Sequence, residues 1–341
     1  MKQLPSIIST DPLDMVPDAA ESDEGADPVE SSELRPFTVG PTEHGQRLDR
    51  ALAALVPEFS RNYLQQLIEA GAVELLGRTL LKASATVRAG QTGHIELRPT
   101  PQSQAFRPEP MDIVTVHEDE HLRIIDKPAG LVVHPAPGHW SGTLLNGLLA
   151  LDPKAALLPR AGIVHRLDRD TSGLMVVART RAAMDAMVAL IAAREVKRQY
   201  LALGHKPWTG AAGRQVDAPI GRDPRNRLRM AVVDLERHAG KTARTLIERL
   251  DSNAQACAVR CTLETGRTHQ IRVHMASIGH PLVGDALYGG APAAGLGRQA
   301  LHAFRLAFVH PVTQAALELR SLPPADLVQA FQALGLDYNR A

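Results

Sequence analysis

Short runs of alternating apolar and polar residues dominate the chain after Met111. Alternation of this kind is typical of strands that bury one face. The runs occupy residues 112–117, 122–126, 174–178, 199–203, 242–247 and 258–263. Helical spacing is less frequent, with one pattern at residues 181–194 and another that begins near Thr268 and ends at Gly279. The sequence therefore predicts an α+β domain over residues 111–325 around a largely antiparallel sheet, followed at 326–341 by a tail or short helix.

The charge of the chain is divided between two parts of opposite sign. Residues 1–36 contain nine acidic and two basic residues, four prolines ahead of Pro36 and no aromatic residue, which predicts a disordered acidic tail. The remaining residues, 37–341, contain 36 basic and 28 acidic residues, a net charge of +8, although the whole chain has only +1. A net positive charge on residues 37–341 is what binding to a polyphosphate partner requires.

A small unit is expected over residues 45–98. Leu48, Leu52 and Leu55 share one helix face, and a second helix follows, with Ser60 as its cap and Gly71 at its end. Short alternating runs at residues 73–76 and 94–97 complete a pattern of two helices on a small sheet. Its basic side chains either form a solvated face or bind RNA: Arg47, Arg50, Arg61, Arg78, Lys82 and Arg88. Residues 99–110, with four prolines, are predicted to be a linker.

The densest group of reactive side chains lies at residues 165–173, just before an apolar run. Asp168, flanked by Arg166 and Arg169, would be held ionised by the nearby cations and could act as nucleophile, base or metal ligand. The alternative is a turn with an exposed ion pair. A metal site formed by Asp168, Asp170 and His165 lacks a second acidic set, so no metal is expected. No glycine-rich phosphate-binding motif is present, so no nucleotide cofactor is expected.

Several features favour a cytoplasmic protein without a membrane span. The longest apolar run, residues 186–193, is far shorter than the roughly 20 residues of a spanning helix, and residues 1–13 do not resemble a secretory signal. Cys257 and Cys261 are four residues apart in an alternating run, too far for a disulfide on one strand, so buried reduced thiols are expected. Nothing indicates an oligomer interface, and a monomer is the default expectation.

Four ordered segments identify a family resemblance. Residues 165–173 resemble the segment that carries the catalytic aspartate in the RluA family of pseudouridine synthases. Residues 126–131, 197–200 and 266–274 are similar to three further blocks of that family, and residues 45–98 resemble the S4 RNA-binding domain. The resemblance covers about residues 45–324 and implies a pseudouridine-synthase fold preceded by an S4 domain. Residues 160–164 and 280–285 are most similar to members that modify large-subunit 23S rRNA in the stem-loop called helix 69.

The resemblance implies isomerisation of uridine to pseudouridine in RNA without a cofactor. By this resemblance Asp168 either attacks C1′ of the target ribose or removes the C2′ proton, and the sequence leaves both routes open. Arg272 matches the residue that the family pairs with the aspartate. Tyr200 matches the tyrosine that stacks on the target base and is a candidate for removing the C5 proton.

The same resemblance indicates residues that would contact RNA. Arg166 is similar to the residue inserted into the RNA when the uridine is flipped out. For His165 and Lys127 an RNA contact and a structural role both remain open. The same two alternatives apply to His134, His269 and His274. An arginine-rich loop is either a solvated segment or a phosphate-binding loop: Arg222, Arg225, Arg227 and Arg229.

The expected partner is large-subunit rRNA or the assembling large ribosomal subunit. Three alternative functions are a related synthase acting on other rRNA or tRNA uridines, a non-catalytic RNA-binding assembly protein, and a metal-dependent nuclease or phosphatase. An acid at position 168 argues against the second, and activity in EDTA would exclude the third.

Overall fold

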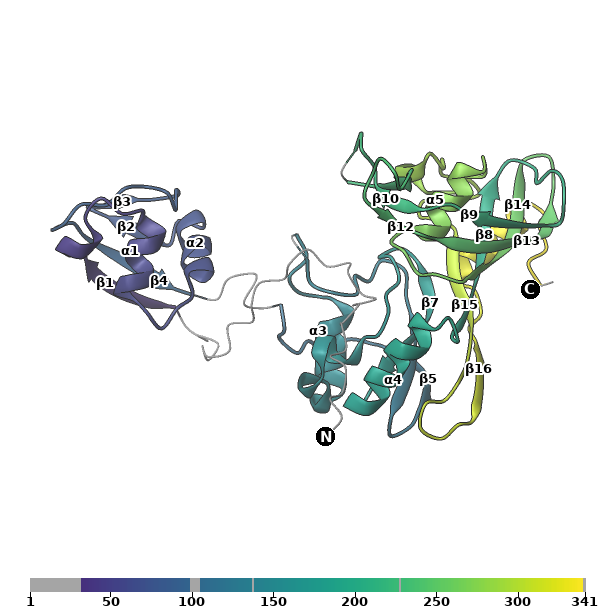
Figure 1. Ribbon diagram of the computed structural model, residues 1–341, viewed down its shortest axis with the longest axis horizontal. Coiled ribbons are helices and arrows are strands. Elements are labelled where there is room, and N and C mark those ends of the chain that lie inside the picture. The colour runs from purple at the N-terminus through teal and green to yellow at the C-terminus, as the bar shows by residue number, and fades with distance from the viewer. Residues whose placement is uncertain (1–31, 99–104, 137, 227, 340–341) are drawn as a thin grey trace, which may run out of the picture. The chain divides into compact units, whose positions relative to one another are not determined.

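The computed structural model describes residues 32–98, 105–136, 138–226 and 228–339 (Figure 1). These residues form two compact units. One comprises residues 108–135 and 142–339, and the other comprises the described residues up to 107 together with 136–141. Most of the predicted acidic tail, residues 1–31, and the centre of the predicted linker, residues 99–104, lie outside the described residues.

The N-terminal unit is a four-stranded antiparallel sheet with two helices packed on it. Its strands, in spatial order, are β1 Glu33–Thr38, β4 Thr92–Leu97, β2 Val73–Leu75 and β3 Arg78–Thr79. The helices are α1 Leu48–Leu55 and α2 Arg61–Glu69, and the Ser60 hydroxyl caps α2 by accepting the N–H of Tyr63. Leu48, Leu52 and Leu64 are fully buried between helices and sheet. The two predicted helices and the strands near residues 73–76 and 94–97 are confirmed.

Strand β1 corrects the predicted end of the acidic tail. It begins at Glu33, inside the segment expected to be disordered, and pairs with β4 along its length. Phe37 and the following Val39 are buried and anchor this segment to the core. Pro36 has no backbone N–H to donate. It is tolerated in β1 because β1 is an edge strand, which pairs with β4 on one side and has no described strand of the sheet on the other. The acidic composition of the preceding residues concealed this strand.

The larger unit is built on a nine-stranded sheet within the described part of the chain. In spatial order its strands are β5 Val114–Glu118, β6 Leu122–Lys127, β7 Ser172–Ala178, β15 Leu301–Val309, β8 Lys197–His205, β14 Ala256–Leu263, β13 Arg244–Ser252 and β9 Gly213–Asp217, with β16 Ala316–Arg320 paired to β15. Only the β7–β15 pairing is parallel among those described, so the prediction of a largely antiparallel, mixed sheet is confirmed.

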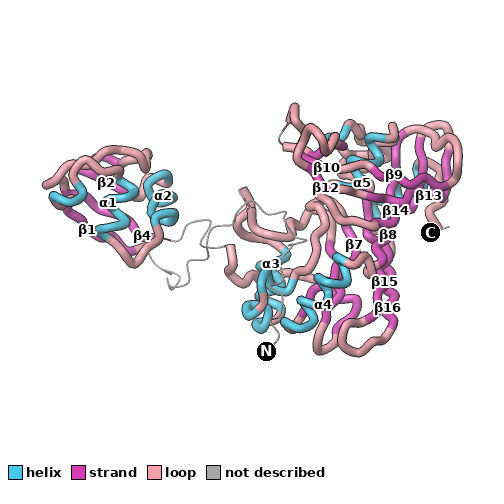
Figure 2. The backbone as a smooth tube through the Cα atoms, viewed as in Figure 1, coloured by secondary structure: helices cyan, strands magenta, loops and turns pink. Residues whose placement is uncertain are grey.

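Helices and a small second sheet surround this large sheet (Figure 2). The α-helices are α3 Leu144–Leu151, α4 Arg181–Ala192, α5 Gln270–Ser277 and α6 Ala325–Ala333, and the 3-10 turns are Pro153–Leu157, Pro159–Gly162 and Ala286–Tyr288. A further 3-10 turn, Pro41–Glu43, belongs to the N-terminal unit. The small sheet has the order β11 Met230–Val232, β10 Ile220–Arg222 and β12 Gly240–Lys241. No helix in the described ranges is long and apolar enough to cross a membrane.

Helix α6 and strand β14 both contribute to the core of this unit. Leu327, Ala330 and Phe331 of α6 are fully buried, so this helix packs as part of the larger unit. Cys257 and Cys261 on β14 are buried and form no disulfide, as predicted. Burial raises the pKa of Cys257 to about 12 and also raises the pKa of Cys261. Both thiols are therefore protonated at neutral pH.

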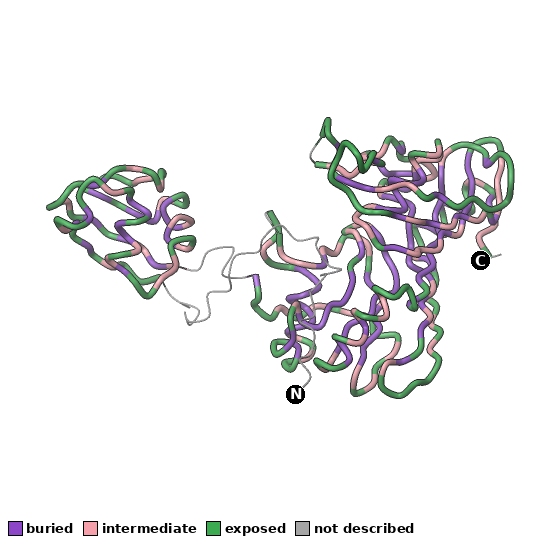
Figure 3. The backbone as a smooth tube through the Cα atoms, in the orientation of Figure 1, coloured by how far each residue is buried: buried purple, intermediate pink, exposed green. Residues whose placement is uncertain are grey.

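The central strands are buried along most of their length (Figure 3). β7 enters this core directly after residues 168–171, so the segment that contains Asp168 leads into a strand whose residues are all buried. Gly173, the second residue of β7, has φ +114°, and an added Cβ would lie 2.3 Å from the carbonyl oxygen of Ala303 on β15. The parallel β7–β15 pairing therefore requires glycine at this position.

Candidate active site

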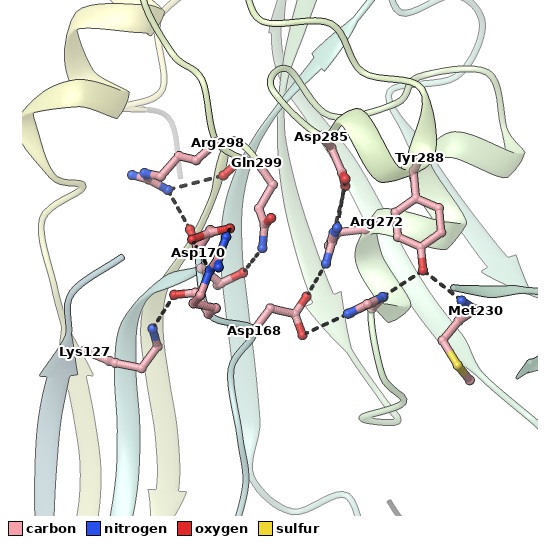
Figure 4. A network of polar contacts seen from close by, with 12 residues as sticks. Lys127, Asp168, Asp170, Met230, Arg272, Asp285, Tyr288, Arg298 and Gln299 are labelled. Carbon is pink, nitrogen blue, oxygen red and sulfur yellow. Dashed lines mark hydrogen bonds and ion pairs between the residues drawn. The ribbon is translucent and has the colours of Figure 1, made fainter. Parts of the chain in front are cut away.

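The backbone that carries Asp168 is fixed by side chains from distant parts of the sequence (Figure 4). The Lys127 ammonium, at the end of β6, donates to the carbonyl of Arg169 at 2.9 Å. The Arg298 guanidinium, just before β15, donates to the carbonyl of Asp170 at 3.0 Å. These contacts hold both residues that follow Asp168 against the sheet, so the carboxylate projects from a rigid turn.

Lys127 stabilises this turn, which favours the structural alternative over an RNA contact. Its side chain is fully buried, and its ammonium donates to the carbonyls of Pro128, Leu131 and Arg169 at 2.8–2.9 Å. An ammonium has three donors, and all of them are used. Burial lowers the pKa of Lys127 to about 8, although the charge of Asp168 opposes the shift. The phosphate-contact alternative fails because no donor and no exposed surface remain.

Arg272 on α5 bridges two carboxylates, one of them Asp168 (Figure 4). Its Nη1 donates to Asp168 Oδ2 at 3.0 Å, while Nε and Nη2 donate to both oxygens of Asp285 at 2.7 and 2.8 Å. Burial by itself would lower the pKa of Arg272, but its hydrogen bonds to Asp285 and the charge of Asp168 raise it above the ordinary value. A permanently charged guanidinium thus forms an ion pair with Asp168 at 3.0 Å.

His269 and Tyr288 form the other side of this group. His269 Nε2 lies 3.8 Å from Asp168 Oδ1, and its Nδ1 lies 2.8 Å from the Tyr288 hydroxyl. Burial lowers the pKa of His269, and the nearby Asp168 only partly opposes this effect. The Tyr288 ring also stacks on the Arg272 guanidinium, whose Cζ is 5.0 Å from the ring centroid. The histidine is therefore neutral at neutral pH and is held in place next to the carboxylate.

Tyr200 reaches the same region from β8. Tyr200 is 5% exposed, and it lines a pocket of about 450 Å³ together with Asp168 and Arg272. Burial raises the pKa of Tyr200, and the charge of Arg198 opposes the shift. The structure therefore brings together the three residues predicted to be catalytic, which come from β8, α5 and the turn before β7.

The pocket is open and predominantly basic. Its ionisable lining, in addition to the histidines and Tyr200, comprises Arg166, Asp168, Arg194, Arg198, Lys241, Glu264, Arg267 and Arg272. Apolar side chains such as Leu167, Leu263 and Leu301 line it as well. A flat uncharged ring could lie among these apolar groups while the basic side chains bind neighbouring phosphates. In the described ranges, no three His, Cys, Asp or Glu side chains are grouped to hold a metal ion.

The other histidines considered from the sequence have structural surroundings. His165 is 8% exposed, its Nε2 accepts the N–H of Val176 at 2.9 Å, and burial lowers its pKa to about 3. This geometry favours the structural alternative over an RNA contact. His274 is fully buried between the Thr245 hydroxyl and the carbonyl of Ala218. Both ring nitrogens of His134 are buried and have no hydrogen-bond partner among the described residues, and burial lowers its pKa to about 4.

Two basic side chains of the N-terminal unit are anchored by a buried acid. Arg47 and Arg61 both form ion pairs with Asp49, and Gln65 donates a further hydrogen bond to it. Burial would raise the pKa of Asp49, but the hydrogen bonds from these partners lower it well below the ordinary value. The side chains of Arg47 and Arg61 remain about half exposed, and Arg50 is exposed as well. The unit therefore presents oriented guanidinium groups to solvent.

The arginine-rich loop after β10 is organised around Asp223. Its buried carboxylate accepts the backbone N–H of Arg225 and pairs with the Arg229 guanidinium at 2.6 Å. Arg222 and Arg225 are exposed. Arg227, which was expected to belong to the same loop, lies outside the described residues.

Three residues of the site received no role from the sequence: Asp285, Tyr288 and Arg198. Together with His269, for which the sequence left an RNA contact and a structural role open, they contact or neighbour the predicted residues. Asp285 belongs to the segment 280–285, whose similarity to relatives was noted, but that similarity did not reveal its contact with Arg272. Tyr288 lies in a 3-10 turn without any motif, so only the folded structure indicates its position.

Comparison with known proteins identifies close relatives. The family model of RNA pseudouridylate synthase matches residues 121–277. The chain is 46% identical to "Ribosomal large subunit pseudouridine synthase D" of Xanthomonas campestris over 335 residues, which covers 94% of this chain and 98% of the relative. It is 41% identical to the protein of the same description from Escherichia coli, with 89% of this chain and 94% of the relative covered.

Solved structures show the same fold at lower identity. "Human RNA Pseudouridylate Synthase Domain Containing 1" is 26% identical and has a TM-score of 0.51 over 63% of this chain and 86% of that one. "Human RNA Pseudouridylate Synthase Domain Containing 4" is 25% identical, also with a TM-score of 0.51, over 66% and 94%. The α+β fold expected from the sequence is thus confirmed by independent structures.

Proposed function

The chain belongs to the RluA family of RNA pseudouridine synthases, which are isomerases, and we propose that it converts uridines of large-subunit rRNA to pseudouridine with Asp168 as the reacting carboxylate. The observation that carries the proposal is the ion pair of Asp168 with Arg272 in a basic pocket. The names of the relatives from Xanthomonas campestris and Escherichia coli support the choice of large-subunit rRNA as substrate.

The reaction requires a carboxylate that is ionised and able to reach the sugar. Arg272 bears on the first requirement because it places a cation 3.0 Å from the Asp168 carboxylate. The second is met because the Asp168 side chain is 18% exposed at the pocket while its backbone is fixed. The carboxylate then either attacks C1′ or removes the C2′ proton, and this geometry is compatible with both routes.

Tyr200 is assigned to the target base. A buried aromatic ring in the same pocket as Asp168 offers a surface on which a flipped-out uracil can stack. Its raised pKa keeps the phenol protonated at neutral pH. The hydroxyl can therefore take part in the removal of the C5 proton only as a relay that passes its own proton onward.

Binding of the surrounding RNA is assigned to exposed basic groups. Arg166 lies at the pocket next to Asp168 and would enter the space that the flipped uridine vacates. The guanidinium groups of Arg47, Arg50 and Arg61 support an S4-type RNA-binding role for residues 45–98. Arg222 and Arg225 would bind phosphates from the loop after β10. We expect the protein to act as a monomer in the cytoplasm, on free rRNA or on the assembling large subunit.

Mapping pseudouridines in the RNA of the host with and without this gene tests the proposal. The expected result is the loss of pseudouridine from the helix 69 stem-loop of 23S rRNA and its restoration by the intact gene. Loss at other rRNA or tRNA positions would replace the proposed substrate with that of a related synthase. An unchanged pseudouridine map would contradict the proposal.

A further inference from the structure

Arg198 is a buried cation at the candidate active site without a carboxylate partner. The residue is 7% exposed and lines the same pocket as Asp168 and Tyr200. Within the described part of the chain no acidic side chain forms an ion pair with it, and its Nε is buried without a hydrogen-bond partner. Burial lowers the pKa of Arg198, and only Tyr200 opposes the shift. A buried charge without a partner is costly, so its retention calls for a functional explanation.

The guanidinium lies directly against Gly266 in the pocket wall, where an added Cβ would be 2.8 Å from Arg198 Nη1. Two further arginines lie nearby, because burial and, to a lesser extent, Arg194 and Arg198 lower the pKa of Arg267, while Glu264 is close to Arg194 at 3.9 Å. The group is therefore placed where an anion from outside the protein would be stabilised.

Its place on β8 indicates which part of the substrate it meets. Arg198 and Tyr200 are two residues apart on one strand, so their side chains project from the same face of the sheet. Under the proposed function, uracil stacks on Tyr200. Arg166 and Arg194 are exposed at the pocket and are better placed for phosphates, which remain near solvent when a base enters a pocket. The buried guanidinium thus faces the base.

We propose that Arg198 is a catalytic residue that stabilises the negative charge that uracil acquires when its bond to the ribose breaks. The electron pair of the N1–C1′ bond moves to N1 and spreads to O2 and O4 of the ring. In the same step Asp168 either donates an electron pair to C1′ or takes the C2′ proton, whose bonding pair forms a C1′–C2′ double bond. Both routes release a uracil anion, so both need a cation beside the base.

The remaining steps balance without another reactant. After the base turns, an electron pair of C5 forms the bond to C1′, and either Asp168 leaves C1′ with its electron pair or the C2′ proton is returned. The C5 proton is lost and N1 gains a proton. The product is an isomer of the substrate, and the anion exists only between bond cleavage and bond formation. Arg198 is required during this interval.

Single-turnover kinetics test the proposal on the full-length protein. We expect Arg198→Met to lower the rate of pseudouridine formation at saturating enzyme by about 10²–10³-fold while the Kd for RNA changes less than about threefold. Arg198→Lys, which keeps the charge, should recover part of the rate. Arg181→Met, which removes an exposed arginine of α4 that pairs with Asp185, is the matched control and should leave the rate unchanged. A rate loss below about fivefold overturns the proposal, as does a loss confined to Kd with a flatter salt dependence.

A substrate with a better leaving group distinguishes catalysis from a structural role. Fluorine at C5 stabilises the uracil anion, so an RNA with 5-fluorouridine at the target position depends less on Arg198. We expect the ratio of wild-type to Arg198→Met rates, measured as loss of the original nucleoside, to be at least about tenfold smaller with 5-fluorouridine than with uridine. Equal ratios overturn the proposal, because a folding defect affects both substrates alike.

This inference rests on the proposed function, but the two fail differently. A wild-type protein that forms no pseudouridine would contradict the proposed function. An active wild-type protein with an equally active Arg198→Met variant would contradict the role of Arg198 alone.

Discussion

Arg272 is bound more closely by Asp285 than by Asp168. Two hydrogen bonds of 2.7 and 2.8 Å join it to Asp285, which is 1% exposed in its side chain, whereas one of 3.0 Å joins it to Asp168. Paired bonds from a planar guanidinium to a carboxylate fix its orientation as well as its position. Asp285 therefore orients Arg272, and Asp168 keeps one oxygen free of this guanidinium for the substrate.

Asp285→Asn should separate this positioning role from chemistry at Asp168. The variant leaves Arg272 without its closest buried counter-charge, so the free energy of unfolding should fall by about 3 kcal/mol and the single-turnover rate should fall as well. Urea unfolding and rate measurements check both effects. Asp185→Asn breaks an exposed pair with Arg181 and should cost less than about 1 kcal/mol. Equal stability losses in the two variants would contradict the role of Asp285.

Tyr200→Phe and Tyr200→Leu should distinguish the ring from the hydroxyl. Phenylalanine keeps the stacking surface but removes the proton relay, so RNA affinity should persist while the rate falls by about 10²-fold. Removal of the C5 proton would then limit the reaction, and deuterium at C5 should slow the Phe variant more than the wild type. Tyr200→Leu should lose the stacking surface too and be slower still. A Phe variant with the wild-type rate would exclude a role for the hydroxyl.

The burial of His165 should make the folded protein less stable in mild acid. Burial lowers its pKa from 6.5 to about 3 in the folded protein, so only the unfolded chain binds a proton at this ring between those values. Stability falls as the pH falls wherever the unfolded state binds more protons, here by about 1.4 kcal/mol per pH unit below 6.5. His165→Gln should therefore lose about 2 kcal/mol less than the wild type between pH 6.5 and pH 5 in urea unfolding. Identical losses would show that His165 is not buried as a neutral ring.

Removing two arginines of the loop after β10 should change how the Kd for RNA depends on salt. If Arg222 and Arg225 each bind a phosphate, replacing both by Gln should flatten the slope of log Kd against log salt by about 1.4, because each contact on a single strand contributes about 0.7. Replacing two other exposed arginines, Arg181 on α4 and Arg320 on β16, should leave the slope unchanged. An unchanged slope for the loop variant would identify the loop as solvated.

Local patterns predicted much of this fold. The apolar spacing around Leu48 and the cap at Ser60 depend on neighbouring residues alone, and the helices they predict are present. Strand β1 was missed because its stability comes from pairing with β4, which begins more than fifty residues later in the chain. The tail boundary at residue 36 was wrong for the same reason.

The site could be predicted only as far as its motifs reach. Asp168, Tyr200 and Arg272 lie in family segments and do meet in one pocket. Lys127 lies in such a segment too, but its burial against three carbonyls could not be inferred from sequence. Asp285 was similarly hidden, because its role depends on a contact between α5 and the turn that follows it, and composition carries no information about that contact.

The most direct test of the account is pseudouridine formation by Asp168→Asn. Asparagine keeps the size of the side chain but removes the charge that the reaction needs. With purified protein and a 23S rRNA transcript, the wild type should form pseudouridine, while the variant should bind the transcript with nearly the same Kd and form none above background, even in a single turnover over hours. Measurable turnover by a folded Asp168→Asn protein would contradict the assignment of Asp168 as the reacting carboxylate.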